Sequence, residues 1–157
     1  MQKFPMTPVG HKKIKVELDD LIKVQRPQNV KDIAVARAHG DLSENAEYHA
    51  AKEKQSFLEG RIQLLSSMIA LAEVIDPSKI KSDKVAFGAT VTLLDVETDD
   101  EKTYFIVGPE EMDVKAGMIS IHSPIAKSLI GKKEGDTVIV KVPAKTIEYE
   151  VLEIKFV

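Results

Sequence analysis

The first half of the chain carries apolar residues at helical spacing. An early series steps mainly by three and four residues through Ile14, Leu18, Leu21, Val30, Ile33 and Ala34. This period predicts an amphipathic helix whose apolar stripe faces a partner. Proline has no amide hydrogen to donate, so we expect Pro27 to kink this helix or to make it restart.

A second helical series follows in two adjacent stripes. One stripe comprises Phe57, Leu64, Met68, Leu71 and Ile75, and the other comprises Leu58, Ile62, Leu65, Ile69 and Ala72. Together they make a face wider than a two-helix seam needs, so we expect the extra width to pack on a second domain. The two series mirror each other about Asp41, which predicts an antiparallel hairpin. Its first helix would be about 36 Å long at 1.5 Å per residue.

The second half changes to the period-two alternation of strands. Strands are predicted at 90–95, 102–107, 117–121, 137–142 and 147–156. One short helix is predicted before the last two strands, with Ser123 as its N-cap, Pro124 at its first position and Gly131 just past its end. A small antiparallel sheet with one helix makes an α+β domain.

These patterns predict two domains joined by a linker. We assign an antiparallel coiled-coil arm to residues 1–76, with an acidic tip at 39–47, a linker to 77–83 and a sheet domain to 84–157. Residues 1–78 hold 11 Lys and Arg and 11 Asp and Glu. Of the 22 basic and 25 acidic residues in the chain, the second half therefore holds 11 and 14, which accounts for the net charge of −3.

Composition excludes several classes of protein. Apolar residues make up 43% of the chain and charged residues 30%, a globular rather than a disordered balance. The absence of cysteine excludes disulfides and thiolate–zinc sites, and fits a cytoplasmic location. We expect no signal peptide and no membrane span, because no apolar run approaches about 20 residues. The sequence has no nucleophile triad, phosphate loop or glycine-rich nucleotide turn.

Acidic residues gather where the predicted hairpin bends. Asp41 and Glu44 offer two carboxylates, and Glu47 lies one turn further on. Magnesium commonly takes one or two protein carboxylates and completes its shell with water and phosphate. We therefore expect at most weak Mg²⁺ binding by the protein alone, and a complete site only if another active site shares the ion.

A structural interpretation of the same residues competes with this one. The sequence Asp41-Leu-Ser-Glu44 fits a capping box, in which the aspartate caps the second helix and the glutamate returns a bond to the backbone. The two interpretations are compatible, because a carboxylate has two oxygens. His39 and His49 do not share a helical face, so we expect them on the surface rather than as metal ligands.

The segment 36–52, ARAHGDLSENAEYHAAK, closely resembles the tip of the bacterial Gre transcript cleavage factors. Similarity continues at Met6–Gly10, at Phe87–Val91 and through Ile119–Gly131, which resembles the family's docking segment. It extends over essentially the whole chain. The tip motif and the overall acidity are closer to the GreA branch than to the GreB branch, whose arm is more basic.

The resemblance implies a coiled-coil arm followed by an FKBP-like domain, in a monomeric protein. The implied partner is bacterial RNA polymerase, entered through its secondary channel, where the RNA 3′ end is extruded when the polymerase backtracks. The factor would stimulate the polymerase's own magnesium-dependent cleavage of that RNA, and so would not be an enzyme by itself. The family is also classed as DNA-binding, although a net charge of −3 predicts little affinity for nucleic acid by the chain unaided.

The resemblance also implies roles for particular residues. Asp41 and Glu44 match the family's essential acidic pair, which shares Mg²⁺ with the polymerase and orients the attacking water. Arg37 and Lys52 match basic positions that meet the extruded RNA. The loop at His122, Ser123 and Pro124 matches the segment that docks at the channel rim.

Two departures and three alternatives remain. His122 stands where the family pattern leads us to expect Asn or Asp, and Ala144–Thr146 replaces a turn that usually contains glycine.

A channel-binding inhibitor of the same shape would plug the channel without cleaving, but its tip would differ in acid pattern. Prolyl isomerase activity would need an aromatic-lined pocket. A helical-hairpin adaptor or chaperone would need apolar tips for its clients, whereas this tip is charged.

Overall fold

The computed structural model describes residues 3–157 and divides into two compact units. Residues 11–72 form a helical arm, whereas residues 3–10 and 73–157 form a globular unit. The boundary therefore differs from the predicted one, because residues 3–10 and 73–76 group with the globular unit. Residues 1 and 2, which we assigned to the arm, lie outside the described residues.

The first helical segment of the hairpin is interrupted close to the position that the sequence predicts. Helix α1 spans Pro8–Asp20, a π-helical segment spans Leu21–Gln25, and helix α2 spans Arg26–Arg37. The amide of Arg26 reaches back five residues to the carbonyl of Leu21, a π-type bond. Pro27 lies in the first turn of α2, where its missing amide hydrogen costs little. The interruption expected at Pro27 is present, but it lies just before the proline rather than after it.

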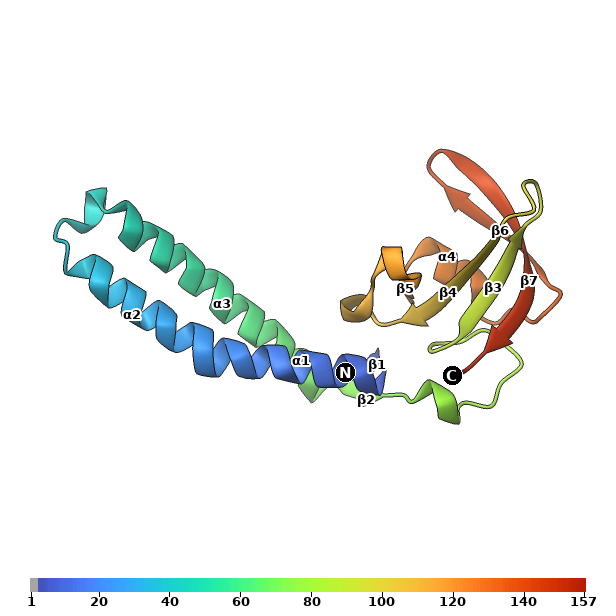
Figure 1. The fold of residues 1–157 in the computed structure, drawn as a ribbon, viewed down its shortest axis with the longest axis horizontal. Helices are drawn as coiled ribbons and strands as arrows, with labels where there is room; N and C mark the ends of the chain where they lie inside the picture. The colour runs from blue at the N-terminus through green and yellow to red at the C-terminus, as the bar shows by residue number, and fades with distance from the viewer. Residues whose placement is uncertain (1–2) are drawn as a thin grey trace. The chain divides into compact units, whose positions relative to one another are not determined.

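Helix α3 spans the 25 residues Ala46–Ala70, about 37 Å at 1.5 Å per residue. Figure 1 shows α2 and α3 lying side by side in opposite directions, which confirms the antiparallel hairpin. One row of buried side chains from each helical segment of the hairpin forms its seam. The first segment contributes Ile14, Leu21, Asn29, Ile33 and Ala36, and α3 contributes Leu58, Ile62, Leu65 and Met68.

The predicted broad apolar face of the second helix is only half right. Phe57 is 71% exposed and Leu64 is 47% exposed, so the first stripe contributes mainly Met68 to the seam. The helix also ends earlier than predicted, because residues 72–74 form strand β2 (Ala72–Val74), which pairs with β1 (Phe4–Met6). The amide of Ile75 continues this pairing with a 2.7 Å bond to the carbonyl of Met6.

Polar bonds cross the hairpin beside the apolar seam. Arg61 forms a two-point ion pair with Glu17 at 2.9 and 3.0 Å, and Arg26 forms another with Glu59 at 2.9 Å. Both pairs are partly exposed, and such pairs typically contribute about 0.2–1 kcal/mol each. The side-chain amide of Asn29 donates to the carbonyl of Ala51 at 3.0 Å. Unlike the ion pairs, Asn29 is buried, with 3% of its surface exposed.

The globular unit contains a five-stranded sheet in the order β5-β4-β3-β7-β6. Its strands are β3 (Thr90–Asp95), β4 (Glu101–Val107), β5 (Met118–Ser120), β6 (Thr137–Val142) and β7 (Lys145–Lys155). Single 3-10 turns occur at Pro77–Lys79, Pro109–Glu111 and Val114–Ala116. All neighbouring strands are antiparallel except β5, which runs parallel to β4. The predicted all-antiparallel sheet is therefore mixed.

The predicted short helix is confirmed as α4, Pro124–Leu129. The Ser123 hydroxyl accepts the amide of Ala126 at 3.2 Å, and Gly131 adopts the positive φ of +85° that ends such helices. Ala126 and Leu129 anchor the helix in the core, which the sheet lines with Val91, Leu93, Ile106, Val138, Val140, Tyr149 and Val151.

The contrast between adjacent leucines of α3 can be measured. Leu65→Ala should lower the free energy of unfolding by about 2–5 kcal/mol, because this fully buried side chain would leave a cavity. Leu64→Ala, the same change one residue earlier, should cost less than about 1 kcal/mol because its side chain is half exposed. Urea unfolding followed by far-UV circular dichroism gives both values, and equal losses would contradict the assignment of the seam.

Candidate functional site at the arm tip

The loop between α2 and α3 places its acidic residues through a few backbone features. Helix α2 ends at Arg37, and Gly40 then turns the chain with a φ of +110°, a conformation that favours glycine. Residues Leu42–Glu44 form one turn of 3-10 helix, and α3 begins at Ala46. All four side chains of residues 41–44 are exposed. The loop therefore presents its carboxylates to solvent.

Asp41 is fixed by its neighbour Ser43. Its Oδ1 accepts the Ser43 hydroxyl at 2.8 Å and the Ser43 amide at 3.0 Å. The hydroxyl bond, and after it the amide bond, lowers the pKa of Asp41 below its ordinary value. Both bonds end on Oδ1, so Oδ2 is left for a further ligand.

The capping box expected at Asp41 and Glu44 is wrong in its details. Asp41 caps the short 3-10 turn rather than α3, because the long helix starts only at Ala46. The Glu44 carboxylate makes no hydrogen bond or ion pair with any residue in the range 3–157, so it returns no bond to the backbone. This leaves both of its oxygens open to an external ligand.

Asn45 caps α3 instead, and sequence reasoning missed it. Its Oδ1 accepts the amide of Tyr48 at 3.0 Å, and its Nδ2 donates to the carbonyl of Ala36 on α2 at 2.6 Å. Asparagine is among the preferred N-cap residues. The signal was therefore present, but Asp41 competed for the same role in the sequence pattern.

The third carboxylate of the tip has a different environment. Glu47 lies 3.4 Å from His39 Nδ1, across the loop from the end of α2. His49 Nε2 lies 3.4 Å from the carbonyl of Ser43. Both histidines are exposed, as expected: His39 lies beside Glu47, and His49 contacts the loop at Ser43. Glu47 therefore differs from Glu44 in having a local partner.

Two basic side chains meet on one side of the hairpin. Arg37 lies at the end of α2, and its guanidinium sits 5.8 Å from the centre of the Tyr48 ring. Lys52, on α3, donates from Nζ to Gln55 at 2.8 Å. Arg37 and Lys52 line a common cavity of about 430 Å³. The structure thus brings together the two cations that the sequence placed 15 residues apart.

The donor set at the tip fits part of a magnesium shell. Across residues 3–157, no group of three or more His, Cys, Asp or Glu side chains lies close enough to hold a metal ion. Asp41 Oδ2 and the Glu44 carboxylate supply hard oxygen ligands, the kind that Mg²⁺ prefers. Two such ligands suit an ion whose remaining ligands come from elsewhere.

The predicted docking loop separates into structural and accessible residues. Ser123 is half-buried and caps α4, so its hydroxyl already has a partner. His122 and Pro124 are exposed, and the backbone of His122 is held by a 3.1 Å bond to the Ser120 hydroxyl. His122 therefore offers an accessible imidazole on a fixed backbone.

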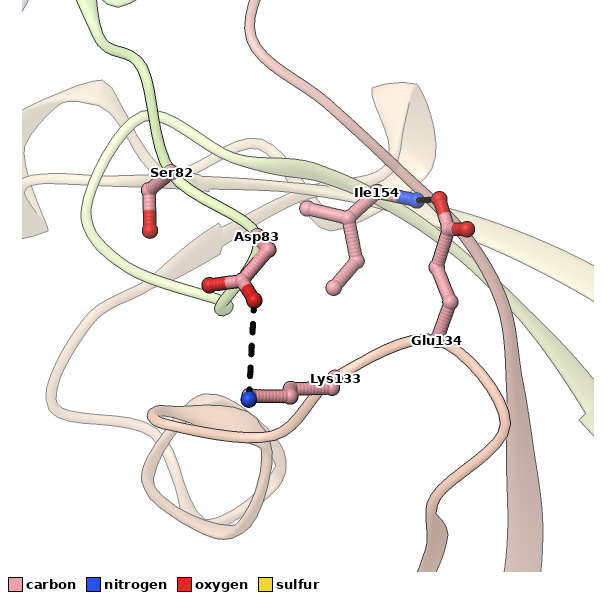
Figure 2. Close-up of a pocket in the computed structure, with 5 residues that line it drawn as sticks. All are labelled: Ser82, Asp83, Lys133, Glu134 and Ile154. Carbon is pink, nitrogen blue, oxygen red and sulfur yellow. Dashed lines mark hydrogen bonds and ion pairs between the residues drawn. The ribbon is translucent and has the colours of Figure 1, made fainter.

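A cavity of about 290 Å³ elsewhere in the globular unit has a structural explanation (Figure 2). Asp83 pairs with Lys133 at 3.5 Å, and Glu134 accepts the amide of Ile154 at 3.0 Å. These contacts tie the segment before β3 and the turn before β6 to the end of β7. The charged side chains that line this cavity already have partners, and none of the predicted site residues lines it.

Comparison with known proteins identifies the family. The profile described as "Transcription elongation factor, N-terminal" matches residues 4–74, and the profile "Transcription elongation factor, GreA/GreB, C-term" matches residues 80–156. The chain belongs to the GreA/GreB family. This confirms the resemblance seen in the tip and in the second half of the sequence.

Similar members of the GreA/GreB family extend over the same length. Transcription elongation factor GreA of Thermodesulfovibrio yellowstonii is 61% identical over 154 residues, which cover 98% of each chain. Transcription elongation factor GreA of Brucella anthropi is 58% identical over 157 residues and covers 100% of both chains. These relatives are named as elongation factors rather than as enzymes.

Two solved structures match the chain over nearly its whole length. The Gfh1 protein of Thermus thermophilus, a GreA factor homologue, covers 98% of this chain and 99% of its own, with 22% identity and a TM-score of 0.46. The GreA/GreB factor of Nitrosomonas europaea covers 99% and 100%, with 20% identity and a TM-score of 0.44. Over the described part of this family member, no helix is both long and apolar enough to cross a bilayer.

The Asp41–Ser43 contact makes a prediction about ionisation. Ser43→Ala should raise the pKa of Asp41 part of the way to its ordinary value, because the hydroxyl bond is lost while the amide bond remains. With a folded pKa below the unfolded one, this carboxylate stabilises the fold above the unfolded pKa. That contribution is lost as the pH falls through the folded pKa.

Carboxyl-detected NMR titration measures this change, and the chain contains an internal control. Asp76 accepts the hydroxyl and amide of Ser78 at 2.7 and 3.0 Å, and its pKa is lowered for the same reason. Ser43→Ala should leave the pKa of Asp76 unchanged. An unchanged Asp41 pKa would show that the serine hydroxyl does not stabilise the tip carboxylate.

Proposed function

We propose that this GreA/GreB family member inserts the tip of its arm into the secondary channel of bacterial RNA polymerase. There it would stimulate the polymerase to cleave the 3′ end of backtracked RNA. The carboxylate pair of Asp41 and Glu44 is the observation that supports this proposal best. Both side chains are exposed at the end of a long two-helix arm and have oxygens without an internal partner.

The pair is suited to completing a site that another protein begins. Asp41 Oδ2 and Glu44 would hold a Mg²⁺ ion whose other ligands come from the polymerase and the RNA phosphate. The chemistry that such an ion supplies is activation of water for attack on the phosphodiester. The serine bonds lower the pKa of Asp41 and hold its carboxylate in one orientation, with Oδ2 left open to a cation.

The two cationic side chains near the tip would bind the phosphate backbone of the extruded RNA. Arg37 and Lys52 are close enough to line one cavity, and both are compatible with phosphate oxygens. Stacking beside Tyr48 orients the Arg37 guanidinium. We infer that the two side chains hold the backbone of the extruded RNA beside the carboxylates. No separate DNA site is proposed.

The globular unit would anchor the factor at the channel rim. His122 and Pro124 are accessible on a backbone fixed by Ser120 and by the cap of α4. In this proposal the protein acts as a monomer in the cytoplasm and contributes ligands to the polymerase active site without being an enzyme alone.

A charge-removing variant tests the tip. Asp41→Asn combined with Glu44→Gln keeps the side-chain shapes but removes both charges. RNA cleavage by a stalled, backtracked polymerase with Mg²⁺ should fall by about 10²-fold or more, the size seen when groups that stabilise a transition state are removed. Binding to the polymerase should persist, because the arm and the globular unit are unchanged.

Glu47→Gln is the matched control, because it removes a carboxylate that pairs with His39 and lies in the first turn of α3, next to the loop. It should retain most of the stimulation. Equal cleavage with the double variant and the parent would reduce Asp41 and Glu44 to structural residues. Polymerase binding without stimulation by the parent would favour a channel-plugging inhibitor, and no polymerase binding would favour an adaptor.

The docking loop has its own test. His122→Ala should weaken binding to the polymerase about tenfold, or about 1.4 kcal/mol, while leaving the melting temperature unchanged, because its side chain is exposed. Ser123→Ala removes the cap of α4 and should instead cost about 1 kcal/mol of stability. Fluorescence anisotropy and thermal unfolding separate the two effects. Unaltered affinity in His122→Ala would exclude this side chain from the interface.

A further inference from the structure

One amide side chain connects the tip loop to both helices of the arm. Asn45 lies between the 3-10 turn that carries Glu44 and the first residue of α3. Its Nδ2 donates to the carbonyl of Ala36 on α2 at 2.6 Å, and its Oδ1 accepts the amide of Tyr48 on α3 at 3.0 Å. Both ends of the amide are therefore used, one for each helix.

The other hydrogen bonds of the loop are local: Gly40 donates to the carbonyl of Arg37 at 3.2 Å, and Ser43 donates to Asp41 at 2.8 and 3.0 Å. Residues 41–44 are exposed, and Leu42, their single large apolar side chain, is 39% exposed. The contacts of His39 with Glu47 and of His49 with Ser43 are both 3.4 Å long. Bonds of this length are weak. A loop without a buried apolar anchor depends on its short hydrogen bonds for its shape, and the 2.6 Å bond of Asn45 crosses from one helix to the other.

We propose that Asn45 is a positioning residue, which holds the Asp41 and Glu44 carboxylates in the arrangement needed to share Mg²⁺. This inference rests on the proposed function. The amide acts through the backbone: it ties the start of α3 to the end of α2 and so fixes both ends of the loop 38–44. Without the bond to Ala36, the loop keeps its charged side chains, but they are no longer held in one position relative to α2 and α3.

The same arm contains a matched bond away from the tip. Asn29 Nδ2 donates to the carbonyl of Ala51 at 3.0 Å, again between α2 and α3. Asn29 and Ala36 are seven residues apart on α2, which corresponds to about 10 Å along the helix. Asn29 is the more buried of the two asparagines, so its loss should destabilise the hairpin at least as much. It is too far along the arm to shape the acidic loop.

The experiment compares Asn45→Ser with Asn29→Ser. Serine is as good an N-cap as asparagine, so Asn45→Ser keeps the cap of α3 while removing the bond to Ala36. Three quantities are measured for each full-length variant: cleavage of backtracked RNA across a Mg²⁺ titration, affinity for the polymerase, and the melting temperature. Asn45→Asp provides a second variant, because aspartate also caps the helix but has no hydrogen to donate to Ala36.

We expect both Asn45 variants to lower cleavage by about 10- to 100-fold at limiting Mg²⁺, the loss that accompanies misplacement of a catalytic group by about 1 Å. For Asn45→Ser, higher Mg²⁺ should restore part of the rate, because weakened ligands need more of the ion. Affinity for the polymerase should change less than about twofold. Asn29→Ser should lower the melting temperature and keep the parent's Mg²⁺ dependence.

Other results would overturn the inference. Parent-like Mg²⁺ dependence in Asn45→Ser, or an equal loss of cleavage in Asn29→Ser, would make Asn45 a structural residue only. Loss of polymerase binding in both Asn45 variants would do the same. If the parent itself fails to stimulate cleavage while binding the polymerase, the proposed function fails first, and the role of Asn45 fails with it.

Discussion

A hairpin of two helices can bury only one line of side chains from each, and the whole arm depends on that narrow seam. Leu65, Ile62 and Ile33 exclude water along it, but apolar contacts alone specify the register of two helices less strictly than polar ones do. Directional bonds remove this freedom. The buried amide of Asn29 and the half-buried amide of Asn45 each satisfy a carbonyl on the opposite helix, and in any other register a buried polar group would be left without a partner.

The tip combines high charge with the absence of a core of its own. Three carboxylates, two histidines and two cations lie within residues 37–52, and the loop at their centre is exposed. Two of the carboxylates have local partners: Ser43 for Asp41 and His39 for Glu47. Glu44 is left without one. The tip thus keeps its shape through hydrogen bonds while leaving the Glu44 carboxylate exposed to solvent.

Much of this fold could be predicted from local signals. Pro27 marked the interruption of the first helix, the Ser123–Pro124 pair marked the start of α4, and alternation marked the hairpin of β3 and β4. The errors share a physical cause. The exposure of Phe57, the early end of α3 and the parallel pairing of β5 all depend on contacts between segments far apart in the sequence, which periodicity does not record.

Charge and spacing in the sequence were sufficient to select Asp41 and Glu44 as candidate ligands, whereas Arg37 and Lys52 were selected through the family resemblance. How the loop is built was predicted less well. The choice between two possible helix caps was not decidable from spacing, because Asp41 and Asn45 both precede good helix formers. The structure resolves it by giving each a separate helical segment.

The π-helical segment at Leu21–Gln25 explains an irregularity in the heptad pattern of the arm. Seam positions follow a four-then-three rhythm through Ile14, Leu18 and Leu21, and the same rhythm resumes at Asn29, Ile33 and Ala36, one residue later than an uninterrupted count would place it. A π turn accommodates one additional residue. The shift in the pattern therefore corresponds to one additional residue, which the π-helical segment accommodates. Removing it would turn everything beyond, the acidic loop included, by about 100° around the helix axis. The length of this segment is thus constrained more tightly than its composition.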